Sequence, residues 1–192
     1  MSPRVREKSA HPRLHLGASA RPLNFTVRRH GHFTVNGTVV GIFMAQRPGL
    51  TLAAVDEAVL EAGRGLVGDR YYLGCGTFSG SLRGKPDAEV TLIEYEEIVR
   101  FNQSDGTDRS PGAFRRNLVT KGVRVNELVG RRFRVGAAEL EGIRLCEPCG
   151  HLAKLVSPSV VKRMAHRAGL RARIVSGASI KKGDAVEVQD AV

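Results

Sequence analysis

The chain has 192 residues, 42% of them hydrophobic, and contains no run of about 18 apolar residues that could span a membrane. This length suits one domain with an appendage and allows a core that needs no disulfides. The three cysteines are an odd number and no apolar signal segment opens the chain, which excludes a secreted disulfide scaffold. We therefore expect a cytoplasmic protein.

The net charge of +11 is concentrated near the N-terminus. Residues 1–37 carry seven Lys or Arg against one Glu, which is more than half of the excess. They show no sustained periodicity, so we expect a basic, disordered extension there and one domain over residues 38–190. A basic nucleic-acid-binding module is an alternative function. It rests on charge alone and lacks an aromatic stacking surface, which makes nucleic acid an unfavoured partner.

A short apolar strand is predicted over 38–43, and a turn follows at 47–49. Residues 52–62 fit a helix or an extended segment equally well, because their alanines and valines recur at helical spacing.

Two glycine-rich segments come next, over 63–70 and 71–86. In the first, Asp69 is typical of a turn or a helix cap, and this structural role is favoured over a functional one for Asp69 and Arg70. The second is predicted to be a mobile surface loop, because no helix follows its glycines as a phosphate-binding loop requires. Cys75, within this loop, is expected to have no role.

A strand is predicted over 89–93, and it runs into a helix that is followed by a loop at 103–112. One face of this helix is defined by four residues, Tyr95, Ile98, Val99 and Asn102.

Two arginines and an asparagine, Arg115, Arg116 and Asn117, precede the next predicted strand. Guanidinium groups make paired hydrogen bonds to phosphate, so this cluster could grip a phosphate or a planar heterocycle. An exposed basic turn is the alternative.

The segment 133–146 is predicted to be a bent strand. Within it, Ala138 and Leu140 occupy even positions, whereas Ile143 and Leu145 occupy odd positions. Both sets can face inward only if one residue is inserted, and Gly142 lies between them, which is typical of a β-bulge. Bulges often redirect side chains near functional sites, and this strand leads directly to a pair of cysteines.

A short helix is predicted after Ser157-Pro158, ended by Gly169, with a buried stripe formed by Val160, Val161, Met164, Ala165 and Ala168. His166 falls opposite that stripe, so it is either solvated or directed at a ligand.

Residues 170–175 alternate in polarity, which places Arg171 and Arg173 together on the outward face of a strand. A closing strand is predicted over 186–188. Many short strands with few helices predict a mainly β, barrel-like domain.

The pair Cys146 and Cys149 leaves several interpretations open. A four-cysteine zinc site needs a second pair, and His151 would bring the ligands only to three. A thioredoxin-like redox pair belongs at the start of a helix in a βαβ unit, which the β pattern disfavours. Two structural cysteines remain possible, as does one working thiolate stabilised by cations such as Arg144. Such a thiolate can carry a persulfide or bind a soft metal.

Five segments in this order closely resemble the MOSC family, named for the C-terminal domain of molybdenum cofactor sulfurase; they are residues 65–71, 90–94, 116–122, 145–149 and 166–172. The resemblance covers about residues 38–190. It implies a β-barrel-like MOSC fold with a few short peripheral helices, and it favours strand over helix at 52–62.

The resemblance also implies a site. Members of this family are thought to carry sulfur as a cysteine persulfide, or to hold the molybdenum cofactor (molybdopterin) through a cysteine thiolate. Their shared cysteine matches Cys149, which would be the catalytic residue and the metal ligand. The resemblance implies five cofactor-binding residues, Arg115, Arg116, Asn117, His166 and Arg171.

The implied function is molybdenum cofactor binding, sulfur transfer through Cys149, or both, with a cysteine desulfurase or a molybdoenzyme as sulfur donor or acceptor. A molybdenum-cofactor-dependent reductase of N-hydroxylated bases is an alternative, and whether the chain is an enzyme stays open. Pyridoxal phosphate binding is implied only at the level of the family. The aminotransferase-like sulfurase domain and the separate β-barrel domain of some relatives have no match in this sequence.

Overall fold

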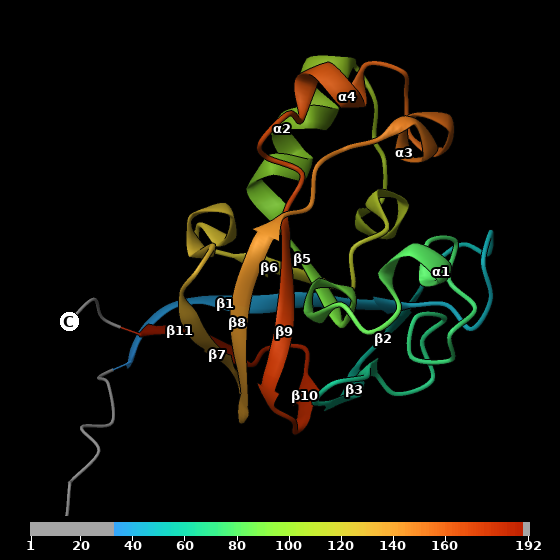
Figure 1. Ribbon diagram of the computed structural model, residues 1–192. Helices are drawn as coiled ribbons and strands as arrows, with labels where there is room; N and C mark the ends of the chain where they lie inside the picture. The colour runs from blue at the N-terminus through green and yellow to red at the C-terminus, as the bar shows by residue number, and fades with distance from the viewer. Residues whose placement is uncertain (1–32, 190–192) are drawn as a thin grey trace, which may run out of the picture. The chain divides into compact units, whose positions relative to one another are not determined.

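The computed structural model describes residues 33–189, which form a mainly β domain with a few short helices (Figure 1). The strands are β1 (Phe33–Met44), β2 (Ala53–Val55), β3 (Glu57–Glu61), β4 (Gly65–Leu66), β5 (Val90–Glu94), β6 (Leu118–Lys121), β7 (Arg132–Val135), β8 (Ala138–Leu145), β9 (Leu170–Ser176), β10 (Ser179–Lys181) and β11 (Ala185–Gln189). The helices are α1 (Ser79–Leu82), α2 (Tyr95–Asp105), α3 (Gly150–Leu155) and α4 (Val160–Arg163). Short 3₁₀ turns span Pro86–Ala88, Pro111–Phe114 and Val125–Leu128.

Seven of the strands close into a barrel in the order β11-β7-β8-β9-β5-β6-β1, because β1 pairs with β11 as well as with β6. Neighbouring strands of the barrel are antiparallel except β5 and β6, which are parallel. β2 extends the sheet beyond β1, and β10, β3 and β4 form a small sheet of their own. The predicted mainly β, barrel-like fold is confirmed.

Period-two alternation fills the barrel with apolar side chains. In β9, Leu170, Ala172 and Ile174 are buried, while Arg171 and Arg173 face outward as the sequence predicts. Burial of these large apolar side chains is the main stabilising contribution to such a domain.

A second apolar cluster lies between the barrel and its helices. Figure 1 shows α2, α3 and α4 gathered at one end of the barrel, at the top of the view. The rings of Phe101 and Phe114 meet edge to face here, with their centroids 5.5 Å apart. The cluster fixes the end of the barrel from which the cysteine segment leaves β8. Its buried members are Ile93, Ile98, Phe101, Phe114, Val119, Leu152, Val156, Val160, Met164 and Ala168.

α2 lies where a helix was predicted, but its buried face is different. Ile98 and Phe101 are buried, whereas Tyr95 is 38% exposed. The helix packs its Phe101 side against the second cluster, and this tertiary contact, which periodicity alone cannot reveal, decides the face. Gly106, in a left-handed conformation, ends the helix.

The first strand is longer than predicted. β1 begins at Phe33 rather than at Thr38, because its first residues pair with β11, with Phe33 opposite Gln189. The rest of the predicted disordered extension, residues 1–32, lies outside the described residues.

Residues 52–62 are extended, as the family resemblance implies, and form β2 and β3. The predicted loop over 63–70 contains the two-residue strand β4. Within residues 33–189, no helix has the length and apolar character needed to cross a membrane.

The helix predicted after Ser157 is shorter than expected. α4 has only four residues, and Val161, predicted to be buried, is 42% exposed. The helix ends at Arg163, well before Gly169, and His166 beyond it adopts a left-handed backbone conformation, with φ of 61°. That conformation lets the His166 backbone N–H and ring reach Glu147.

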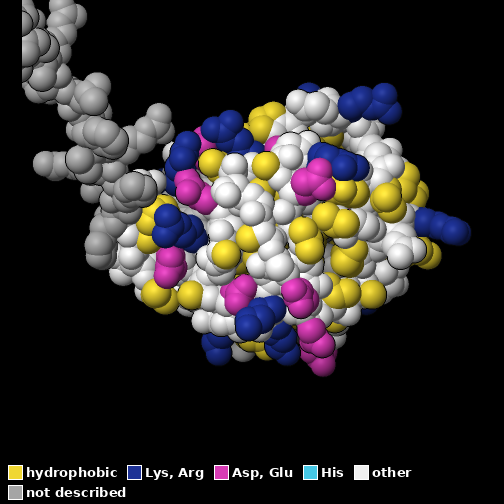
Figure 2. Space-filling view, turned by 90° about the horizontal axis from the view of Figure 1, so that it is seen from below, with side chains coloured by type: hydrophobic (Ala, Val, Ile, Leu, Met, Phe, Trp, Pro, Cys, Tyr) yellow, Lys and Arg dark blue, Asp and Glu magenta, His cyan; other side chains and the backbone are white. Residues whose placement is uncertain are grey.

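Charged side chains of both signs are interspersed with hydrophobic ones on the face of the domain shown in Figure 2. Nucleic-acid binding draws on rows of cations that neutralise several phosphates at once. Among the described residues, this face presents no such continuous basic surface.

Candidate functional site

The predicted bulge in β8 is present. Gly142 pairs with Ala172 and Arg144 pairs with Arg171, so Ile143 is the inserted residue. A Cβ on Gly142 would lie only 2.0 Å from the backbone oxygen of Leu128, so only glycine fits without a shift of the backbone. Beyond the bulge, the strand directs the chain toward the two cysteines.

The two cysteines have different surroundings. Cys146 is buried, and its N–H donates to the Gly169 carbonyl over 2.7 Å, which prolongs the pairing of β8 with β9. Cys149 is exposed and is the N-cap residue of α3, a helix of six residues that the sequence pattern did not predict. Neither forms a disulfide, and Cys75 is a third free thiol, exposed in a separate loop.

Cys149 opens into a hollow of about 70 Å³. Five parts of the chain contribute to it: the loop after β4, the start of β5, the turn before β6, the cysteine segment and β9. Its walls carry four arginines and a single carboxylate, so the hollow attracts anions. The lining residues are Arg70, Tyr71, Thr77, Phe78, Ala88, Thr91, Arg115, Arg116, Asn117, Cys146, Glu147, Cys149, His151, Leu152 and Arg171.

Arg116, which was predicted to bind a ligand, is buried, and its hydrogen bonds connect three segments of the chain at the site. Its Nε donates to the Ala168 carbonyl over 2.8 Å, its Nη1 to Phe114 over 3.1 Å, and its Nη2 to Cys146 over 2.6 Å. Each nitrogen of the guanidinium therefore already serves a backbone carbonyl. Arg116 adds positive charge to the hollow and holds the cysteine segment in place.

Asn117 has a similar structural role. Its Oδ1 accepts hydrogen bonds from the Thr91 hydroxyl over 2.8 Å and from the Thr91 N–H over 3.3 Å, and its Nδ2 donates to the Phe43 carbonyl over 3.3 Å. These bonds join β1, β5 and the start of β6. The carboxamide lines the hollow with its polar groups largely satisfied.

Arg115 and Arg171 are the two predicted cations whose guanidinium groups make fewer hydrogen bonds than that of Arg116. Arg115 has a left-handed backbone, φ of 64°, and one of its nitrogens donates to the Leu50 carbonyl. Burial lowers the pKa of Arg115, and the charge of nearby Arg70 lowers it further. Within residues 33–189 the Arg171 guanidinium makes one hydrogen bond, 3.1 Å to the Asp87 carbonyl. Both guanidiniums keep donors for an anion in the hollow.

Arg70 and Tyr71 belong to the site, although sequence reasoning favoured a structural role. Asp69 behaves as predicted for a turn residue: its carboxylate accepts from the Tyr71 N–H over 3.0 Å and from the Ala45 N–H over 3.2 Å. It also pairs with Arg70 over 2.9 Å. The Arg70 guanidinium lies over the Tyr71 ring, 4.9 Å from its centroid. From the sequence alone, an Asp-Arg pair in a glycine-rich loop looks the same whether the two side chains are buried, as they are here, or lie in an exposed turn.

Two predicted residues lie outside the hollow. His166 is exposed, as predicted, but its Nδ1 is 2.7 Å from Glu147 Oε1 instead of facing the hollow. The carboxylate that lines the site is thus held from behind by His166. Arg144 pairs with Asp87 over 2.6 Å and does not line the hollow, whereas His151 does.

Metal binding by several protein ligands has no support in the described part of the chain, because no group of three or more His, Cys, Asp or Glu side chains gathers there. The hollow instead offers one exposed thiol among arginines. This arrangement suits an anion bound at, or formed on, the sulfur of Cys149.

Comparison with known proteins gives the family. The model of the MOSC domain matches residues 79–187. Solved structures similar to this chain include YuaD from Bacillus subtilis, with 16% identity over 81% of this chain and 97% of that one and a TM-score of 0.69. YiiM from Geobacillus stearothermophilus gives 15% identity, coverages of 83% and 76%, and a TM-score of 0.57. YiiM from Escherichia coli has 19% identity over 81% of this chain and 71% of that one, with a TM-score of 0.58.

At such identities the structural likeness shows the fold alone. None of the curated proteins matches the chain. The family model nevertheless spans more than half of the sequence and includes the bulged strand, both cysteines and β9. The chain therefore belongs to the MOSC domain family.

Proposed function

We propose that this protein carries sulfur as a persulfide on Cys149. The observation that carries the proposal is the single exposed thiol in a hollow with four arginines on its walls. A persulfide anion is small enough for a volume of about 70 Å³, and neighbouring guanidinium groups stabilise it.

The transfer step needs a donor that itself bears a persulfide. The Cys149 thiolate attacks the outer sulfur of the donor persulfide, a new S–S bond forms on Cys149, and the donor S–S bond breaks. The donor leaves as a thiolate, so no external oxidant or reductant is consumed. A cysteine desulfurase fits the donor role, and a molybdoenzyme fits the acceptor role.

The chain's own residues would perform distinct tasks in this step. Arg115 and Arg171 would donate hydrogen bonds to the anionic sulfur, since both retain donors. Arg116 would act as a positioning residue, because it fixes the Cys146 carbonyl three residues before the thiol.

A second version of this function is binding of the molybdenum cofactor through the same thiolate. The donor set fits: one exposed sulfur for the metal, and arginines for the anionic groups of the organic part. Bound there, the cofactor would supply the redox chemistry needed for a reductase of N-hydroxylated bases. Membership of the MOSC family favours this version, and loss of such reductase activity in Cys149→Ser would support it.

The test is a comparison of Cys149→Ser with Cys75→Ser, which removes another exposed thiol. Freshly purified protein is analysed by intact mass and by elemental analysis. We expect either one extra sulfur atom or stoichiometric molybdenum in the parent chain and in Cys75→Ser, and neither in Cys149→Ser. Unchanged sulfur and molybdenum content in Cys149→Ser would exclude both versions.

A further inference from the structure

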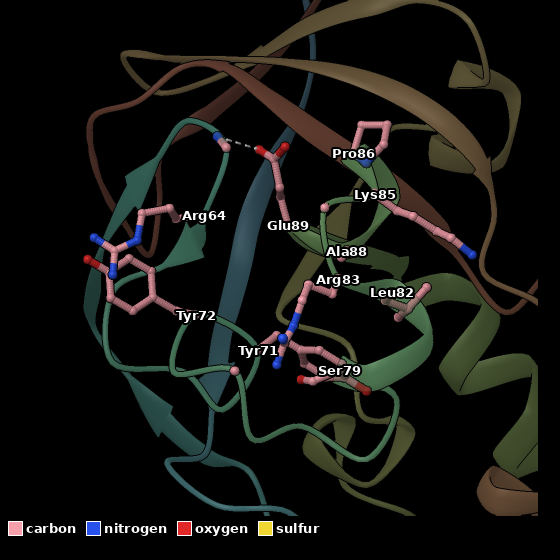
Figure 3. Close-up of a pocket in the computed structure, with 13 residues that line it drawn as sticks. Arg64, Tyr71, Tyr72, Ser79, Leu82, Arg83, Lys85, Pro86, Ala88 and Glu89 are labelled. Carbon is pink, nitrogen blue, oxygen red and sulfur yellow. Dashed lines mark hydrogen bonds between the residues drawn. The ribbon is translucent and has the colours of Figure 1, made fainter.

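A second hollow, of about 320 Å³, adjoins the Cys149 site (Figure 3). Tyr71 and Ala88 line both, so the Tyr71 side chain forms the partition. Its ring lies close to Gly76, where a Cβ would come within 2.7 Å of it, and Arg70 lies over it. Cavities that bind small organic molecules start at about 300 Å³.

Three cationic side chains line this hollow, and they differ in whether they form ion pairs. Arg64 pairs with Glu61 over 3.1 Å and lies over the Tyr72 ring, 4.0 Å from its centroid. Arg83 and Lys85 have no carboxylate partner among residues 33–189. In Figure 3, Arg83 extends toward Tyr71, at the partition between the two hollows.

Glu89 is the one carboxylate among the lining residues, and it does not offset these cations directly. Its Oε2 accepts hydrogen bonds from the Ile174 N–H over 2.8 Å and from the Gly63 N–H over 3.1 Å. Burial raises the pKa of this carboxyl. The carboxylate is therefore turned to the backbone.

Ser79 supplies a further donor. Its hydroxyl oxygen is buried and has no hydrogen-bond partner among the described residues, although the residue lines the hollow. A buried hydroxyl without a partner costs stability, and a ligand that reached it from the hollow would supply the missing bond.

We propose that the second hollow binds a phosphate monoester of nucleotide size, with the phosphate held by Arg83 and the Ser79 hydroxyl and with Lys85 adding positive charge at the wall. Guanidinium and hydroxyl donors match the oxygens of a phosphate. The remainder of the ligand extends past Tyr71 toward Cys149. The role of this ligand as the reaction partner of Cys149 rests on the proposed function, whereas its binding does not.

Adenosine 5′-monophosphate is the probe, titrated into the full chain by calorimetry, with adenosine and inorganic phosphate as comparisons. We expect one site per chain for the monophosphate, at least roughly tenfold weaker binding of adenosine, and competition by inorganic phosphate. The double variant Arg83→Ala/Lys85→Ala should bind the monophosphate at least roughly tenfold more weakly.

The matched control is Arg47→Ala/Lys162→Ala, which removes the same charge from exposed positions elsewhere. Its affinity should stay within about twofold of the parent. Equal losses in the two double variants, equally tight binding of adenosine, or no binding of the monophosphate would each overturn the proposal.

Ser79→Ala tests the role of the hydroxyl separately. Removing an unpartnered hydroxyl should not lower the free energy of unfolding, yet binding of the monophosphate should weaken several-fold. Unchanged affinity would remove Ser79 from the site.

Cys149→Ser separates this proposal from the proposed function, because it should bind the monophosphate as tightly as the parent does. Protein loaded with molybdenum cofactor distinguishes two sources of the phosphate. Retained binding of the monophosphate assigns the hollow to a separate substrate, whereas lost binding assigns it to the phosphate end of the cofactor.

Discussion

The two hollows that meet at Tyr71 are built in opposite ways. Around Cys149, the volume is small and two of the polar side chains, Arg116 and Asn117, are committed to the backbone. In the second hollow, the volume is larger and Arg83 and Lys85 remain without ion-pair partners among the described residues. The difference separates a rigid frame, which positions one reactive atom, from a surface whose donors are left for a ligand.

The largest effect should come from breaking the rigid frame. Arg116→Lys keeps the charge but leaves carbonyls that one ammonium cannot all reach, so we expect a loss of about 3 kcal/mol in the free energy of unfolding. Urea unfolding measures it.

Arg83→Lys is the matched change in the second hollow. Because Arg83 is exposed and has no ion-pair partner in the described part of the chain, its variant should stay within about 0.5 kcal/mol of the parent. Similar losses at the two positions would contradict the distinction between the hollows.

The bulge should be the next most sensitive element. Gly142→Ala places a methyl group against the Leu128 carbonyl, so we expect a loss of about 2 kcal/mol in the free energy of unfolding, measured by urea unfolding.

Gly150→Ala provides the control near Cys149. A Cβ there meets nothing within 4 Å, and alanine favours the helix α3. Its stability should be unchanged or slightly higher, and a loss that matched Gly142→Ala would argue against a steric cause.

A smaller effect should appear in the chemistry of the thiol. With Cys75→Ser as background, Cys149 is the exposed thiol of the described residues, and its alkylation by anionic iodoacetate can be compared with that by neutral iodoacetamide. Arg115→Gln and Arg171→Gln should each lower the ratio of the two rates about threefold, because each removes a cation from the hollow.

Arg83→Gln, across the partition, should change this ratio much less. An equal drop would mean that general surface charge, rather than the arginines beside Cys149, attracts the anionic reagent.

The smallest effect concerns pH. Since burial raises the pKa of Glu89 above its usual value of 4.5, the folded protein holds this proton more tightly than the unfolded chain. The contribution of Glu89 to stability is therefore present below pH 4.5 and is lost as pH rises through the folded pKa. Relative to the parent, Glu89→Gln should become more stable between about pH 4 and about pH 7, as measured by urea midpoints.

Glu61→Gln should show the opposite trend. A hydrogen bond from Tyr72 lowers the pKa of Glu61, so its contribution is present at neutral pH and is lost on acidification. Parallel trends in the two variants would contradict the assigned environments.

Local alternation in the sequence was sufficient to predict β9 and the bulge in β8. It was wrong in treating 133–146 as one strand, because the chain turns at Gly136 and forms two antiparallel strands, β7 and β8. Leu170, Ala172 and Ile174 repeat with period two, and the change of parity around Gly142 needs only one inserted residue. Such signals lie within a few residues of one another. The six-residue helix α3 and the four-residue helix α4 are too short to show a helical period.

The roles of the site residues depend on partners far away in the sequence. Arg116 donates to residues 30 and 52 positions away, and nothing in its neighbourhood separates this buried arrangement from an exposed phosphate-binding one. Arg115 and Arg171, which the family resemblance implies as site residues, line the same hollow as Cys149, whereas the resemblance could not show that His166 lies behind Glu147. Most residues that line the second hollow belong to the predicted surface loop at 71–86, and the glycine-rich composition of this loop does not reveal that it forms a cavity.

Closure of the barrel by β1 and β11 has a consequence for biosynthesis. The strands that complete the ring are the first and last ones described, so a ribosome must finish nearly the whole domain before the ring can close. Cys149 emerges earlier, before β9 brings Arg171 to it. The cation-lined hollow around Cys149 is therefore complete only after β9 has been synthesised and has paired with β8.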